Sequence, residues 1–281
     1  MNIPFTKMHG IGNDFIVVDC RTSLLHDPKA FAIKYCDRRF GIGADQLLLL
    51  YPSAVGDFKM LIFNADGSEV EMCGNGIRCF AKYIWDRKIS DKAVLDVETL
   101  AGIIRPERAG DMVKVDMGEP ILEPARIPVN LQGPGPIIDY PVEAMGRIFN
   151  VTFVSMGNPH AVIFLDENVT EFPVDTYGPL IENHALFPKR INVEFVNKKS
   201  DTELVMRVWE RGSGITLACG TGATATGIAA MVKKLTRKRV TVHLLGGDLD
   251  IEWADNGHAY MTGPAEEVFE GAIPCQPEAR K

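Results

Sequence analysis

The sequence has few of the patterns that mark metal centres, membrane spans or nucleic-acid binding. Its six cysteines include no Cys-x-x-Cys pair and its six histidines show no ligand spacing, so a zinc site is not expected. Its longest apolar runs, such as residues 47–51, are far shorter than the roughly 20 residues that a membrane-spanning helix needs. Lysine and arginine do not cluster, and the net charge is −7. We therefore expect neither nucleic acid nor anionic membrane as a partner.

What is present is the composition of an ordinary globular protein. Hydrophobic residues make up 46% and charged residues 24% of the 281 residues. A chain of this length suits two domains of about 140 residues each. Residues 1–7 show no basic stretch followed by an apolar run, and we expect a cytoplasmic enzyme without a disulfide framework.

One short motif occurs twice. Cys73-Gly74-Asn75-Gly76 and Cys219-Gly220-Thr221-Gly222 share the pattern Cys-Gly-x-Gly, and each precedes a stretch with an apolar face of helical period. The two faces consist of Ile77, Phe80, Ala81, Ile84 and Trp85 in the first copy, and of Ala225, Ile228, Ala229, Val232 and Leu235 in the second. Each cysteine should lie just before a helix N-terminus, where N–H groups and the helix dipole favour negative charge and lower the pKa of a thiol.

The repeat extends beyond the cysteines. Five separated points recur at an offset of 145 or 146 residues, which predicts two copies of one α/β unit. The matched points are Gly12-Asn13 with Gly157-Asn158, Gly67-Ser68 with Gly212-Ser213, Cys73 with Cys219, Gly118 with Gly263, and the apolar strands 15–19 with 161–166.

The local patterns predict helices at 28–38, 75–86, 175–186 and 221–235. Strands are predicted at 3–7, 15–19, 46–50, 58–63, 93–98, 102–106 and 112–115 in the first copy. Those of the second copy are predicted at 147–154, 161–165, 191–196, 203–209 and 240–244. The segment 118–136, rich in proline and glycine, reads as a linker, and the tail after Gly263 should return to the first domain. We expect domains of residues 1–118 plus 264–281 and of residues 119–263.

Two cysteines in equivalent settings suit one reaction in particular. Domains related by duplication usually meet about a pseudo-twofold axis, so we expect the two motifs to face each other. Inverting a carbon centre requires removal of a proton on one face and delivery on the other, which one thiolate and one thiol can perform. Backbone N–H groups of Gly74, Asn75, Gly220 and Thr221 would stabilise the negative charge that develops on the substrate.

Seven motifs together make the sequence similar to the diaminopimelate epimerase family over nearly its full length. They are MHGIGNDF (8–15), FGIGADQ (40–46), NADGS (64–68), MCGNGIRC (72–79), GNPH (157–160), WERG (209–212) and ACGTG (218–222). The resemblance implies two pseudo-symmetric α/β (α+β) domains, each a mostly antiparallel sheet or barrel around a central helix. It also implies interconversion of LL- and meso-diaminopimelate, for lysine and peptidoglycan precursors, without pyridoxal phosphate or metal.

The resemblance assigns roles to individual residues. Cys73 and Cys219 become the acid/base thiols, and His160 and Glu210 tune their pKa values. Arg211 can fork onto the distal carboxylate of the substrate, and Glu210 can hold an ammonium. The implied substrate site comprises Asn13, Gln46, Asn64, Gly74, Asn75, Asn158, Asn192, Glu210, Arg211, Gly220 and Thr221. The family commonly has tyrosine at a dimer contact where this chain has Phe269, and we expect a homodimer.

Other interpretations compete with this one. Most cytosolic cysteines are small buried hydrophobes, which is our prediction for Cys20, Cys36, Cys79 and Cys275. Residues 220–225 match the dinucleotide-binding pattern G-x-G-x-x-A, without the expected preceding strand or the acidic residue that should follow. A redox switch between Cys73 and Cys219 is a third possibility. A proline or hydroxyproline racemase of the same fold is the nearest rival.

Overall fold

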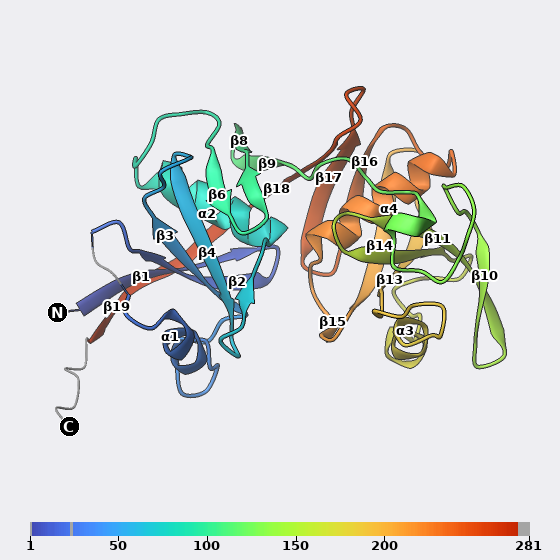
Figure 1. Ribbon diagram of the computed structural model, residues 1–281, viewed down its shortest axis with the longest axis horizontal. Helices are drawn as coiled ribbons and strands as arrows, with labels where there is room; N and C mark the ends of the chain where they lie inside the picture. The colour runs from blue at the N-terminus through green and yellow to red at the C-terminus, as the bar shows by residue number, and fades with distance from the viewer. Residues whose placement is uncertain (1, 23–24, 275–281) are drawn as a thin grey trace. The chain divides into compact units, whose positions relative to one another are not determined.

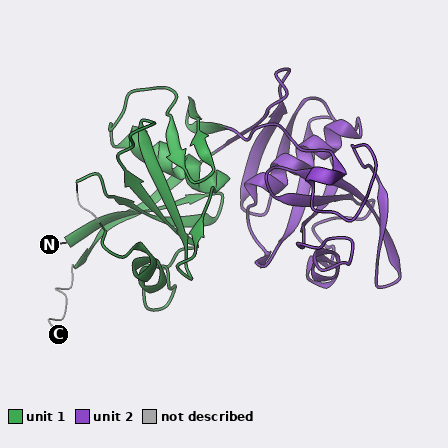
Figure 2. Ribbon diagram, in the orientation of Figure 1, with its two compact units in different colours: residues 1–115, 264–281 green, residues 116–263 purple. Residues whose placement is uncertain are grey.

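The computed structural model describes residues 2–22 and 25–274, which form two compact units. Unit 1 comprises residues 1–115 and 264–281, and unit 2 comprises residues 116–263 (Figure 2). The sequence predicts the first change of domain after residue 118, whereas the structure places the change of unit after Val115.

The described residues of unit 1 form the helices α1 and α2 and a mixed sheet (Figure 1). Its strands follow the order β19-β1-β2-β3-β4-β6-β7, with β5 paired to β4, and β8 and β9 form a hairpin. The elements are β1 (Asn2–Gly10), β2 (Asn13–Asp19), α1 (Pro28–Tyr35), β3 (Gln46–Tyr51), β4 (Phe58–Asn64), β5 (Glu69–Val70), α2 (Gly74–Asp86), β6 (Val97–Thr99), β7 (Gly102–Ile104), β8 (Pro106–Ala109), β9 (Met112–Asp116) and β19 (Glu266–Pro274).

Unit 2 repeats this order of elements. Its strands follow the order β10-β11-β12-β13-β14-β16-β17-β18, with β15 paired to β14. The elements are the short 3-10 helix η1 (Pro124–Arg126), β10 (Tyr140–Ala144), β11 (Arg147–Ser155), β12 (Pro159–Phe164), α3 (Val174–Glu182), β13 (Asn192–Lys198), β14 (Glu203–Glu210), β15 (Gly214–Ile215), α4 (Gly220–Val232), β16 (Arg239–Leu244), β17 (Gly247–Trp253) and β18 (Ala259–Gly263).

The repeat shows in how the strands pair. In unit 1 the parallel pairs are β2 with β3 and β4 with β6, joined through α1 and α2. In unit 2 they are β12 with β13 and β14 with β16, joined through α3 and α4. Most other pairs are antiparallel, so the predicted duplication and the mixed α/β fold are confirmed.

Both faces of the central strands are covered, which explains why β3 is apolar throughout. Leu47 and Leu49 belong to a core cluster with Phe31 of α1, while Leu48 contacts Gly76 of α2. A strand covered on both faces has no solvent side to make polar, so its hydrophobic run is continuous rather than alternating. The helix in each unit that carries the Cys-Gly motif is therefore held against a buried sheet.

The expectation about the segment rich in proline and glycine needs correction. The segment 118–136 is not a free linker, because Ile127 and Val129 are buried in the core of unit 2. The tail pairs with β1 along β19, where Ile273 is buried and Val268 and Phe269 are about half exposed. Proline and glycine predict irregular backbone, and irregular backbone can still pack.

Some bounds also differ from those predicted. Helix α1 begins at Pro28 as expected, with the Asp27 side chain accepting a bond from Ala30 N, but it ends at Tyr35 because Asp37 starts a turn. The strand predicted at 93–98 shortens to β6, and β10, β17, β18 and β19 were not predicted at all. Within the described ranges, no helix is long and apolar enough to cross a membrane.

Candidate active site

Three predicted site residues of unit 1 lie at one end of neighbouring strands. Asn13 begins β2, Gln46 begins β3 and Asn64 ends β4. Gln46 and Asn64 are directly paired across the sheet, and Gln46 Nε2 donates to Asn64 Oδ1 at 2.8 Å. Gln46 Oε1 is buried and has no hydrogen-bond partner in the structure. The amide groups of these three residues therefore lie together at one end of the central strands.

Cys73 is the residue that caps helix α2. Its backbone is extended (φ −136°, ψ 118°), and its sulfur accepts a hydrogen bond from Gly76 N at 3.4 Å. Cysteine thus occupies the position where serine, threonine or aspartate usually caps a helix. The same sulfur lies 3.6 Å from Asn13 Oδ1, so the start of β2 and the start of α2 meet at this thiol.

A directed chain of hydrogen bonds orients Asn13. Arg78 Nη1 donates to Asn75 Oδ1 at 2.9 Å, Asn75 Nδ2 donates to Asn13 Oδ1 at 3.2 Å, and Asn13 Nδ2 donates to Asp45 Oδ2 at 2.8 Å. A guanidinium only donates and a carboxylate only accepts, so the ends fix both amide orientations. The oxygen of Asn13, rather than its nitrogen, therefore faces Cys73.

The loop that carries Asn13 is held by an ion-pair network. Asp14 accepts hydrogen bonds from Lys7 and from the Arg38 guanidinium, which also reaches Asp45. Burial raises the pKa of Asp14, but the bonds from Arg38 and Lys7 outweigh burial and hold that pKa well below its usual range. Asp14 is thus ionised at neutral pH.

In unit 2, Cys219 caps helix α4 in the same way. Its backbone is extended (φ −125°, ψ 106°), and its sulfur accepts a hydrogen bond from Gly222 N at 3.3 Å. The Thr221 hydroxyl oxygen lies 3.6 Å from the sulfur. The cysteine is only 6% exposed. Both Cys-Gly motifs therefore form caps of the central helix of their unit.

A chain of mostly buried polar side chains connects to the first turn of α4, next to Cys219. His160 Nδ1 and Glu194 Oε1 are 2.6 Å apart, and both side chains are fully buried. His160 Nε2 lies 3.1 Å from Asn158 Oδ1, and Asn158 Nδ2 donates to Thr221 Oγ1 at 3.2 Å. Three predicted residues, His160, Asn158 and Thr221, are therefore joined in one chain that leads to Cys219.

The pKa of Cys219 differs from the expectation. Burial raises it well above its usual value, and the carboxylates of Glu210 and Glu194 raise it further. The Thr221 hydroxyl and the Gly222 N–H lower it, but they are outweighed. The expectation that a helix N-terminus lowers the thiol pKa is thus wrong for Cys219, because that expectation ignored burial and negative neighbours.

Glu210 also has a raised pKa. Burial is the largest cause, and the neighbouring Glu194 adds to it, whereas hydrogen bonds from Thr216 and Cys219 lower the pKa of Glu210. Glu194 itself has its pKa raised by burial, against the influence of His160. Two buried acids and one thiol thus share a small region of unit 2.

Asn192 and Arg211 lie at the end of the neighbouring strands. Asn192 is buried, its amide donates to Pro159 O at 2.9 Å, and its oxygen accepts from Arg211 N at 2.9 Å. The Arg211 side chain is exposed, with Nη1 bonded to Lys189 O at 3.2 Å. Asn192 therefore fixes the backbone from which the Arg211 guanidinium extends.

Four residues that shape these groups were not predicted. Glu194 is the only charged residue in the strand segment 191–196 and stands between Val193 and Phe195, a local signal that the sequence does carry. Asp45, Arg78 and Thr216 orient Asn13, Asn75 and Glu210 in turn. Asp45 lies 32 residues from Asn13, whereas Arg78 and Thr216 lie three and six residues from their partners, and no periodic pattern marks any of the three. Among the described residues, no cluster of three or more His, Cys, Asp or Glu side chains could hold a metal ion.

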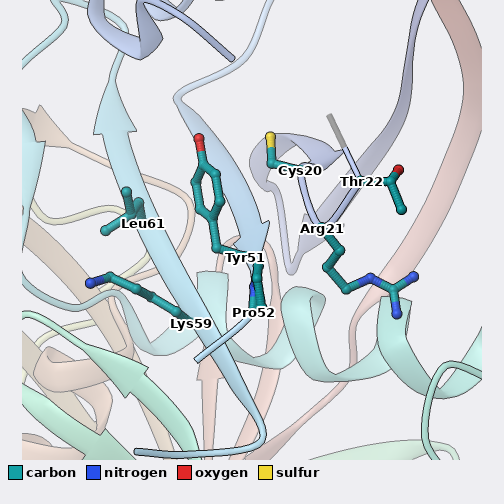
Figure 3. A pocket seen from close by; sticks show the side chains of 7 residues that line it. All are labelled: Cys20, Arg21, Thr22, Tyr51, Pro52, Lys59 and Leu61. Atoms are coloured by element: carbon teal, nitrogen blue, oxygen red, sulfur yellow. The ribbon is translucent and has the colours of Figure 1, made fainter. Parts of the chain in front are cut away.

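A pocket of about 420 Å³ in unit 1 contains none of the predicted site residues. Figure 3 shows it lined by Cys20, Arg21, Thr22, Tyr51, Pro52, Lys59 and Leu61. Asn13 begins β2 and Cys20 directly follows that strand, while Gln46 begins β3 and Tyr51 ends it. The pocket therefore lies at the opposite end of β2 and β3 from the predicted site residues.

Cys20, Cys36 and Cys79 are buried unpaired thiols, as predicted, and Cys275 lies outside the described residues.

Known proteins match the chain in sequence and in structure. The sequence model of the family "Diaminopimelate epimerase" matches residues 5–123 and 152–268. A diaminopimelate epimerase of Acetivibrio thermocellus is 54% identical over 96% of this chain and 98% of its own. One of Methanococcus maripaludis is 53% identical over 96% and 99%.

Solved structures share the fold at low sequence identity. A phenazine biosynthesis PhzC/PhzF protein from Clostridium difficile has a TM-score of 0.72 at 13% identity, over 97% of this chain and 100% of the other. A probable proline racemase from Agrobacterium radiobacter has a TM-score of 0.69 at 14% identity, over 99% and 94%. Because proteins with different names share this fold, the fold alone does not determine the substrate.

Proposed function

The chain belongs to the diaminopimelate epimerase family, and from that premise we propose that this isomerase interconverts LL- and meso-2,6-diaminopimelate by proton transfer at Cα. The product would serve lysine and peptidoglycan precursor biosynthesis, and the reaction would use no metal and no pyridoxal phosphate. The observation that carries the proposal is the equivalent placement of Cys73 and Cys219, each as the cap of the central helix of its unit.

In the proposed mechanism the two thiols act on opposite faces of one Cα. One sulfur, as thiolate, removes the proton, and the other, as thiol, delivers a proton to the opposite face, so that the configuration inverts. After the reaction the protonation states of the sulfurs are exchanged, which allows the reverse reaction. Neither sulfur forms a bond to carbon.

The negative charge of the carbanion and of its carboxylate requires stabilisation. We assign this role to the first-turn N–H groups of α2 and α4, at Gly74, Asn75, Gly220 and Thr221, because helix N-termini favour anions. Within unit 2, His160 and Glu210 would modulate the Cys219 thiol. Glu210 would do so through its charge, which raises the pKa of Cys219, and His160 through Glu194, which lies 2.6 Å from it.

The remaining polar residues suit a substrate with an ammonium and a carboxylate at each end. Arg211 has an exposed guanidinium that can bind the distal carboxylate, and Glu210 can bind an ammonium. The amides that complete the proposed substrate site are Asn13, Gln46, Asn64, Asn158 and Asn192. A cyclic imino acid has no second charged end for these groups to bind, which disfavours proline.

Location and assembly stay predictions. A cytoplasmic location is supported by the buried unpaired thiols of Cys20, Cys36 and Cys79. A homodimer is supported by Phe269, an exposed aromatic residue on β19 at the edge of the unit 1 sheet.

Deuterium incorporation tests the proposed reaction. The protein is incubated in deuterated water with LL-diaminopimelate, and separately with proline, and Cα deuterium is measured by mass spectrometry. We expect label in diaminopimelate, together with appearance of the meso form, and none in proline. Label at Cα of proline alone would refute the assignment.

A further inference from the structure

Glu194 is a fully buried carboxylate to which the resemblance assigns no role. It lies on β13 between the apolar residues Val193 and Phe195. Its Oε1 lies 2.6 Å from His160 Nδ1, whereas its Oε2 is buried and makes no hydrogen bond. Burying a half-satisfied carboxylate is unfavourable, so packing alone does not explain its presence.

The repeat supplies an internal comparison. By strand register, Phe15 on β2 and Leu48 on β3 occupy the positions of His160 on β12 and Glu194 on β13. Unit 1 thus forms the same strands and the same capped helix with two hydrocarbon side chains at these positions. The fold of the unit does not need the His160–Glu194 pair, which is a difference between the two cysteine environments.

The carboxylate of Glu194 lies against the first turn of α4. A Cβ built on Gly222 would be 2.8 Å from Glu194 Oε1 and 3.1 Å from Cys219 Sγ, so both atoms approach the same glycine. A negative charge on Glu194, beside the same glycine as the Cys219 sulfur, disfavours the thiolate form of Cys219. It also opposes the effect of the helix N–H groups, which favour the thiolate.

The geometry fixes the direction in which the pair points. His160 Nδ1 lies 2.6 Å from Glu194 Oε1, and His160 Nε2 lies 3.1 Å from Asn158 Oδ1. The carboxylate of the pair therefore lies at the helix that carries Cys219, and the imidazole lies between that carboxylate and Asn158.

Building on the proposed function, we propose that Glu194 is a positioning residue of the epimerase site. Its carboxylate, held in place by His160, keeps the proton on Cys219 in the free protein. The charged groups that act on this thiol come from adjacent strands: Glu194 from β13, Glu210 from β14, and His160 from β12 as the partner of Glu194. Cys219 is then the thiol member of the pair at rest, and Cys73 the thiolate member.

This assignment predicts which part of the pH profile depends on Glu194. A reaction that needs one thiol and one thiolate loses activity at high pH, when the protonated member also ionises. That alkaline limb belongs to Cys219. The acid limb, where the thiolate member gains a proton, belongs to Cys73.

The variant Glu194→Gln removes the charge and keeps the size. We expect the alkaline limb of log kcat/KM to move to lower pH by about one pH unit, while the acid limb stays in place. Glu194→Asp retains a charge and should hold the limb closer to the wild-type position. Glu203→Gln is the matched control, because Glu203 forms a solvent-accessible pair with His243 at 3.5 Å in the same unit, and both limbs should stay unchanged.

A direct measurement separates this inference from the proposed function. The ¹³Cβ resonance of Cys219 in the free protein is followed against pH, and its midpoint should be lower in Glu194→Gln than in the wild type. No substrate is needed, so failure to epimerise diaminopimelate would refute the function and leave this test intact. Should Glu194→Gln not fold, the double variant His160→Phe/Glu194→Leu copies the apolar pair of unit 1. An unchanged Cys219 midpoint in the folded variant would overturn the inference.

Discussion

At the scale of single residues, the two catalytic candidates share a position and differ in surroundings. The Cys73 sulfur lies 3.6 Å from the amide oxygen of Asn13. The Cys219 sulfur lies 3.6 Å from the Thr221 hydroxyl and near the carboxylates of Glu210 and Glu194. The capping positions could be predicted because each cap is local to its motif. The raised pKa of Cys219 could not, because Glu194 and Glu210 reach it from separate strands.

Removing either sulfur should abolish epimerisation. Cys73→Ala and Cys219→Ala each leave one proton donor or acceptor, so turnover should fall below detection in a coupled assay or by deuterium exchange. Cys73→Ser and Cys219→Ser should fold and lose at least about 100-fold in kcat, because a hydroxyl is a far weaker acid than a thiol. Cys20→Ala, a buried cysteine at the opposite end of the sheet, should keep full activity. Appreciable turnover by either alanine variant would contradict the two-thiol scheme.

At the scale of elements, the helices that carry the cysteines and the strands beneath them could be predicted to within a few residues. Period and glycine punctuation mark β2, β3, β4, α2 and α4 clearly. The strand β17 does alternate, with Leu249 and Ile251 buried between acidic residues, so its signal is present in the sequence, whereas β18 has only five residues and its buried positions are Ala259, Met261 and Gly263. Helix α1 ended early because a turn at Asp37 competes with its last predicted turn.

The first turn of α4 has no room for a side chain at Gly222. In Gly222→Ala the new Cβ would lie 2.8 Å from Glu194 Oε1, so the carboxylate or Cys219 must move. Alanine ordinarily stabilises a helix relative to glycine by about 0.5–1 kcal/mol, but here crowding should cost about 1–3 kcal/mol. We expect a lower midpoint of urea unfolding and a reduced kcat. Gly76→Ala in α2, where the nearest atom lies at 3.3 Å, should cost clearly less. Equal losses in both variants would argue against a special crowding at Gly222.

At the scale of the whole molecule, the duplication was visible in the sequence because glycines and cysteines recur at a nearly constant offset. The role of segment 118–136 could not be predicted. Its prolines indicate an irregular backbone, and the burial of Ile127 and Val129 depends on neighbours from other parts of unit 2. The return of the tail required a partner strand, β1, more than 250 residues earlier in the chain.

The dimer prediction depends on Phe269. This residue is 46% exposed on the edge strand β19 and packs edge-on against Phe5 at a ring distance of 6.0 Å. Phe269→Asp replaces the exposed aromatic ring with a charge and should convert a dimer to monomers in sedimentation velocity runs, whereas Phe269→Tyr should retain the dimer. Val55→Asp, at an exposed apolar residue elsewhere on unit 1, is the control and should not dissociate it. A monomeric wild-type protein, or a dimeric Phe269→Asp variant, would show the prediction to be wrong.

The interleaving of the chain has a consequence for its biosynthesis. Unit 2 is one continuous segment, whereas unit 1 receives its edge strand β19 from residues 266–274. During synthesis on the ribosome, residues 116–263 emerge before β19 does. Unit 2, which carries Cys219, can therefore fold while β1 of unit 1 still lacks its partner strand β19. A nascent chain therefore completes the Cys73 half last, and premature termination after Gly263 leaves β1 as an open edge, prone to join another strand.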